Sequence, residues 1–130
     1  MDLREYYLAL ASSITEADLN LAAVVMSSHV GKAMAITKAE LTCKLFGKTT
    51  DSTERKARET LKRLVSECGI AAGSNSGSTG YYICETDAEK SECIAELKSR
   101  ARELNERAYS LFSVNLPSPT SINRLQGWLF

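Results

Sequence analysis

The chain has 130 residues, of which 44% are hydrophobic and 25% are charged. This composition is ordinary for one globular domain and excludes global disorder, a collagen-like repeat and a disulfide-stapled miniprotein. Its 16 Lys and Arg residues balance 16 Asp and Glu residues, so the chain as a whole is not a polycation.

Two helices are predicted at the start of the chain, over Leu3–Ile14 and Ala17–Val30. The second helix has a strongly apolar centre at Ala22–Met26, which is typical of a helix buried in a core. We expect Gly31 to end it, because glycine commonly follows the last residue of a helix. An extended segment, Ala35-Ile36, comes next.

Two capping boxes, in which a first side chain and a fourth cap each other's backbone N–H groups, mark the next helix starts. Thr37–Glu40 opens a short helix that ends at Gly47. Asp51–Glu54 opens a longer helix that ends at Gly69. Apolar positions of the longer helix recur at helical spacing and predict one buried stripe: Ala57, Leu61, Leu64, Val65 and Cys68.

The pattern after Gly69 indicates a hairpin of two short strands, Ile70–Ala72 and Tyr81–Cys84, around a Gly- and Ser-rich loop. Tyr81 and Tyr82 alternate faces, so we expect one in the core and the other available to a phosphate. A third capping box, Thr86–Glu89, opens a long helix through about Phe112. Pro117 and Pro119 then break the chain before an apolar tail.

Charge is concentrated in the middle of the chain. Residues 1–31 carry one Arg against four acidic residues, residues 32–63 carry nine Lys and Arg against four, and residues 64–130 carry six against eight. The basic third coincides with the two capped helices, which is a local feature that the neutral total charge hides.

The order of the elements predicts a mainly α fold with a small β-hairpin, a winged helix-turn-helix. We expect this domain to span residues 1–85, the long helix residues 86–115, and a proline-containing linker with its apolar tail residues 116–130. In such folds the second motif helix enters the major groove and the hairpin follows the DNA backbone. Arginine suits bidentate contact with guanine, and hydroxyl groups suit phosphates or bases. The DNA-binding candidates are Thr37, Lys38, Ser52, Thr53, Arg55, Lys56, Arg58, Lys62, Ser76 and Ser78.

The competing interpretation of the basic helix is an ordinary solvated face. The hairpin loop has no Lys or Arg, so it can offer only hydroxyl, amide and backbone contacts. Lys62 and Arg63 lie late in the helix, where phosphate contact is the expected role.

Four short segments resemble a group of bacterial phage and prophage winged-helix proteins over about residues 24–112. They are His29–Gly31, Ala35–Thr37, Arg55–Arg58 and Gly80–Tyr82. The resemblance implies double-stranded DNA contact through the arginine-bearing helix, a role in DNA replication or transcription regulation, and a location in the bacterial host cytoplasm. It implies no catalytic residue. The segment Gly47–Ser52 is longer than in that group, which leaves the direction of the helix open.

The last five residues resemble the motif by which bacterial replication and repair proteins dock on the sliding clamp. In this interpretation the Gln126 amide bonds the rim of a pocket that Leu129 and Phe130 fill, with Trp128 beside them. The alternative is that Ile122, Leu125, Trp128 and Leu129 pack back onto the domain. The alternative function is a protein-interaction adaptor, in which the winged helix, the long helix and the tail bind a replication or host protein such as the sliding clamp.

The long helix carries apolar residues at alternating spacings of three and four, as in a coiled coil. These residues are Ile94, Leu97, Ala101, Leu104, Ala108 and Leu111. They predict either a homodimer contact or a stripe packed on the N-terminal helices.

The four cysteines form no CxxC pair and are accompanied by one histidine, His29, so we predict reduced thiols and no metal. We interpret His29 as a structural residue, because nothing positions it beside an activated nucleophile. We therefore expect no enzyme activity and no cofactor. No apolar run approaches the ~20 residues that span a bilayer, and the first residues do not resemble a signal peptide, so we also expect no membrane partner.

Overall fold

The computed structural model describes residues 1–74 and 80–129, with the backbone alone at residues 128 and 129. Its described part is mainly helical with a small antiparallel sheet, which confirms the predicted α+β class. The chain forms two compact units, Met1–Leu97 and Lys98–Phe130. The boundary between these units lies within the long helix, which contributes to both. Among the described residues, no helix has the length and apolarity needed to cross a membrane.

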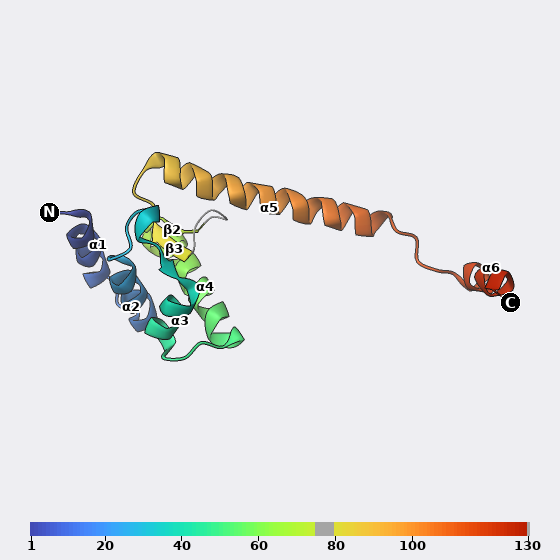
Figure 1. Ribbon diagram of the computed structural model, residues 1–130, viewed down its shortest axis with the longest axis horizontal. Coiled ribbons are helices and arrows are strands. Elements are labelled where there is room, and N and C mark those ends of the chain that lie inside the picture. Colours follow the sequence, from blue (N-terminus) through green and yellow to red (C-terminus); the bar gives the residue numbers. More distant parts are fainter. Residues whose placement is uncertain (75–79, 130) are drawn as a thin grey trace. The chain divides into compact units, whose positions relative to one another are not determined.

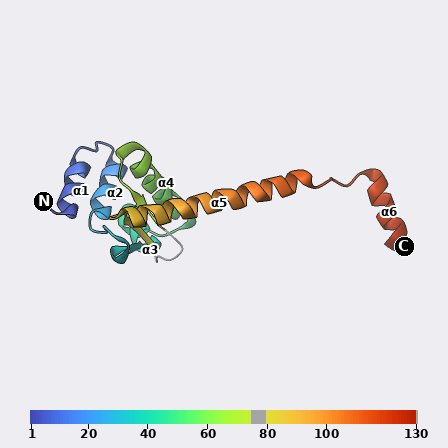
Figure 2. The ribbon, with the colours of Figure 1, turned by 90° about the horizontal axis from the view of Figure 1, so that it is seen from above.

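Helices α1 (Leu3–Ser12) and α2 (Ala17–Met26) lie side by side in both views of the ribbon (Figure 1, Figure 2). The amide of Asn20 donates to the Ala11 carbonyl at 2.8 Å and joins the two helices. Helix α2 also packs on α3 (Lys38–Phe46) and α4 (Asp51–Cys68), so it is the centre of the first unit. Its buried side chains are Leu19, Ala22, Ala23 and Met26.

Helix α2 ends at Met26, four residues before the predicted end at Val30. The reason is a backbone pairing with a distant strand: Ile83 donates to the His29 carbonyl, and Gly31 donates to the Ile83 carbonyl, both at 2.8 Å. Gly31 has φ +90°, a backbone conformation that favours glycine, and it precedes the short 3-10 helix η1 (Lys32–Met34). Glycine is therefore needed for this turn and not for the end of α2.

The sheet has three strands in the order β1-β3-β2. Strand β1 (Ile36–Thr37) and strand β2 (Ala72–Gly73) both pair antiparallel with β3 (Gly80–Ile83). The predicted hairpin is therefore present, with its first strand two residues later than expected. The side chains of Ile36, Tyr82 and Ile83 are almost fully buried, so the sheet closes one side of the core.

The second unit contains the C-terminal part of α5 (Asp87–Ser113) and α6 (Pro119–Leu129). Cys93 is the last residue along the chain that is buried among those described. The hydrophobic core cluster accordingly lies in the first unit.

Candidate nucleic-acid interface

The start of α4 is set by Thr50 rather than by Asp51, which corrects the predicted cap by one residue. The Thr53 N–H donates to the Thr50 hydroxyl at 3.2 Å, and the Thr50 N–H donates to the Thr53 hydroxyl at 2.8 Å. Asp51 is the first residue of the helix, where its negative charge is favourable to the helix dipole.

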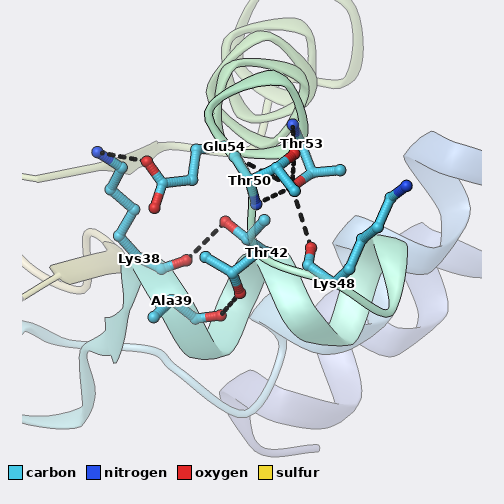
Figure 3. A network of polar contacts seen from close by, with 8 residues as sticks. Lys38, Ala39, Thr42, Lys48, Thr50, Thr53 and Glu54 are labelled. Carbon is cyan, nitrogen blue, oxygen red and sulfur yellow. Dashed lines mark hydrogen bonds and ion pairs between the residues drawn. The ribbon is translucent and has the colours of Figure 1, made fainter.

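The junction between α3 and α4 is a short loop, Gly47–Thr50, held by polar contacts on both sides (Figure 3). The Lys38 ammonium lies 3.2 Å from the Glu54 carboxylate, which joins the first turns of the two helices. The Thr53 hydroxyl donates to the Lys48 carbonyl at 3.0 Å. These contacts fix the direction of α4 relative to α3, which the sequence left open.

Three cations, Arg55, Arg58 and Lys62, share the outward face of α4. Their spacings of three and four residues place them in one row, on the side opposite the buried residues of the helix, Thr53, Ala57, Leu61 and Leu64. All three are exposed, and no hydrogen bond or ion pair within the described part of the chain engages their side chains. The row, which we call the α4 cation row, can therefore meet an anionic surface without first breaking an internal contact.

Ser52 and Lys56 are also exposed and lie to one side of the α4 cation row. Two further exposed cations, Lys44 and Lys48, come from α3 and the loop after it. Figure 3 shows the Lys48 ammonium pointing away from the polar network. These two lysines are not among the predicted DNA contacts, although both belong to the basic segment 32–63.

Two of the predicted DNA contacts have other roles. Thr53 is buried, with 5% of its surface exposed, and its hydroxyl is used inside the α3–α4 junction. It therefore points into the protein and not toward a ligand. Lys38 is half-buried and paired with Glu54.

Thr37 caps α3, as predicted, by accepting from the Glu40 N–H at 3.1 Å. The Thr37 hydroxyl is the acceptor in this bond, so its own hydrogen can still be donated.

Arg63, a predicted phosphate contact, is bound within the protein. Its guanidinium donates to both carboxylate oxygens of Glu16, at 2.7 and 2.5 Å, and also to Glu67. These hydrogen bonds raise the pKa of Arg63 and lower the pKa values of Glu16 and Glu67. Arg63 therefore joins α4 to the start of α2, and the cations available on α4 stop at Lys62.

The loop of the hairpin, including the predicted contacts Ser76 and Ser78, lies outside the described residues. Tyr82 is the core tyrosine: it is fully buried, and its hydroxyl lies 3.4 Å from the Cys93 sulfur. Burial raises its pKa. Tyr81 is half-buried and packs against the core cluster.

The cysteines and the histidine of the described residues lie at structural positions. Within the described residues no group of three or more His, Cys, Asp and Glu side chains could hold a metal ion. Cys84 and Cys93 lie 3.9 Å apart as free thiols, and burial raises the pKa of Cys84 to about 12. The Nδ1 atom of His29 lies 2.7 Å from the Met34 carbonyl oxygen, and this contact is consistent with a structural role for His29.

The structure bears on only part of the tail prediction. Helix α6 includes Gln126, which is exposed, whereas the side chains of Trp128 and Leu129 and all of Phe130 lie outside the description. Ile122 and Leu125 are exposed, at 48% and 62%. The predicted row on α5 is exposed at Ile94, Leu97, Leu104 and Leu111.

Comparisons with protein-family models, with curated proteins and with solved structures found no match to the chain.

Proposed function

We propose that the first unit is a winged helix that binds double-stranded DNA through α4, in DNA replication or transcription regulation of the phage and prophage type. The carrying observation is the α4 cation row: Arg55, Arg58 and Lys62 are exposed on one face and unengaged by described side chains. The sheet order β1-β3-β2 supports the proposal, because it brings the strand before α3 beside the hairpin that follows α4.

The proposed division of roles follows from position along α4. Arg55 and Arg58 lie in the first half of the helix and would contact base edges in the major groove. Lys62 lies one turn later and would neutralise a phosphate, with Lys44 and Lys48 as further phosphate contacts. No catalytic step and no cofactor enter this proposal.

The test is a fluorescence anisotropy titration of a mixed-sequence duplex at about 50 and 200 mM salt. The intact protein should bind more weakly at the higher salt, because bound phosphates release counterions. The double variant Arg55→Ala/Arg58→Ala should lose at least about tenfold in affinity and reduce the logarithmic salt slope by about 2.

The matched control is Arg4→Ala/Lys90→Ala, which removes two exposed positive charges from the same unit but from outside α4. It should bind as the intact protein does. Equal losses in both variants would mean that only total charge matters, and an unchanged Arg55/Arg58 variant would refute the proposed interface.

A second candidate function is docking on a sliding clamp or another replication protein through the tail. The observation that favours it is the exposure of Ile122 and Leu125 on α6, together with a core cluster that lies in the first unit. Deleting residues 126–130 should abolish binding to a purified bacterial sliding clamp in calorimetry and leave duplex binding unchanged. A large fall in the melting temperature of the deleted chain would instead identify the tail as part of the core.

A further inference from the structure

The long helix α5 carries a row of apolar side chains, most of which are exposed. We call the α5 stripe the residues at coiled-coil spacing, Ile94, Leu97, Ala101, Leu104, Ala108 and Leu111. The exposed fractions of Leu97, Leu104 and Leu111 are 61%, 59% and 75%, and Cys93 is the buried residue of this 27-residue helix. A helix of this length gains most of its stability from packing an apolar face, so the α5 stripe needs a partner surface.

The side chains beside the stripe indicate what that partner is. One edge carries Lys98, Asn105 and Phe112, and the other carries Arg100 and Arg107. The acidic residues of this part of the helix, Glu96, Glu103 and Glu106, occupy the positions away from the stripe. The two edges are therefore different: after the buried Cys93 one edge is purely cationic, and the other is mainly neutral.

Two copies of this stripe fit together in a parallel pair. In a parallel coiled coil, each residue of one edge meets the residue five positions later on the opposite edge of the partner helix. Arg100 then meets the partner's Asn105, whose amide oxygen accepts hydrogen bonds, and Arg107 meets the partner's Phe112, whose ring attracts a guanidinium. Leucines fill every second layer, and the small Ala101 and Ala108 let the two helices approach closely.

An antiparallel pair of the same stripes is unfavourable. Aligning Leu97 and Leu104 of one copy with Ala108 and Ala101 of the other places Arg100 of one helix against Arg107 of the partner, and by symmetry this happens twice. Like charges that face each other across a helix interface disfavour that arrangement. The edges of the stripe therefore select a direction as well as a partner.

We propose that the α5 stripe binds the α5 stripe of a second copy of this chain in a parallel, two-fold symmetric coiled coil. Two-fold symmetry is the arrangement in which helix-turn-helix dimers contact paired DNA half-sites. Contact with half-sites rests on the proposed function, whereas the pairing itself does not.

The first experiment measures the mass of the full-length chain without DNA by sedimentation equilibrium. We expect a mass that approaches twice the 14.2 kDa of the chain as the protein concentration rises. The helical signal in circular dichroism should increase over the same concentration range. Leu104→Glu/Leu111→Glu should remain monomeric, and the control Ser99→Glu/Ser110→Glu, which adds the same charges to the opposite face of α5, should still dimerise. A monomer up to about 100 µM, or a dimer that survives the leucine changes, overturns the proposal.

The second experiment tests the direction and does not depend on a disruptive variant. In a parallel pair Ala108 meets the partner's Ala108, so Ala108→Cys should form a disulfide between copies in a glutathione redox buffer, found by peptide mapping. The control Ser110→Cys lies on the far face and should not form one. A dimer in which the Ala108→Cys variant fails to cross-link overturns the parallel arrangement. Because neither experiment contains DNA, their failure is distinct from a failure of duplex binding.

Discussion

At the residue scale, Thr53 performs two tasks with one hydroxyl. It accepts from the Thr50 N–H at 2.8 Å, which completes the cap of α4, and donates to the Lys48 carbonyl at 3.0 Å, which holds the preceding loop. The side chain is 5% exposed, so water cannot replace either bond easily. The position of Thr53 thus sets the direction of the proposed recognition helix.

We predict that Thr53→Val destabilises the protein by about 1–2 kcal/mol, because valine keeps the shape but leaves the Thr50 N–H and the Lys48 carbonyl without their partner. Urea unfolding followed by circular dichroism measures this difference. The neighbouring Ser52→Ala, at an exposed position, should change stability by less than about 0.5 kcal/mol. A Thr53→Val protein as stable as the original would show that these two bonds do not matter.

Local sequence could not identify Thr53 as a structural residue. Thr50 and Asp51 are both good N-cap residues, and each has a side chain three positions later that can complete a box. The choice between the two caps depends on the hydrogen bond from Thr53 to the Lys48 carbonyl and on the Lys38–Glu54 ion pair. Both contacts form only when the protein folds. With Thr50 as the cap, the Thr53 side chain points into the protein, and the α4 cation row consists of Arg55, Arg58 and Lys62.

At the element scale, Gly80 controls how closely β1 approaches β3. It faces Thr37 across the antiparallel pair. A Cβ atom added at Gly80 would lie 1.8 Å from the Ile36 carbonyl oxygen and 2.9 Å from the Thr37 Cα, both of which are backbone atoms. These atoms cannot move without separating the strands.

We therefore expect Gly80→Ala to destabilise the first unit by about 1–3 kcal/mol, the range for overpacking. Thermal unfolding measures the change, and hydrogen exchange should show faster exchange at β1. Gly127→Ala is the control, since its Cβ would meet nothing within 4 Å. Equal stability of the Gly80→Ala and original proteins would contradict the observed register.

The distance in sequence between contacting residues explains which elements could be predicted from the sequence. The amphipathic stripe of α4, the glycine at its end and the hairpin depend on neighbours close in sequence, and the structure confirms them. The early end of α2 depends on backbone bonds to Ile83, and strand β1 depends on pairing with Gly80 and Tyr81, all of which are distant in the sequence. Val65, predicted to be in the stripe, is 46% exposed, because it follows the buried Leu64 by one residue and so lies about 100° around the helix from it.

At the scale of the whole molecule, the numbers of positive and negative charges are equal, but the two kinds of charge have different structural roles. The cations of α4 face outward, whereas several acidic residues hold elements together. Glu89 is the clearest case: its carboxylate accepts from the Glu85 N–H at 2.9 Å and the Lys32 N–H at 3.0 Å. These backbone bonds join the end of the sheet, the turn after α2 and the start of α5, and they lower the pKa of Glu89 below its usual 4.5.

Because the folded protein holds Glu89 at a pKa below its unfolded value, the carboxylate stabilises the fold fully above about pH 4.5, and this contribution is lost as the pH falls through the folded pKa. We predict that Glu89→Gln lowers the melting temperature at about pH 7 and that the difference from the original protein narrows toward about pH 3, where the original carboxylate is protonated. Melting curves across this range test the prediction. Glu103→Gln, at an exposed position of α5, should follow the original protein throughout, and a Glu89→Gln deficit that stays constant with pH would exclude the charge as its cause.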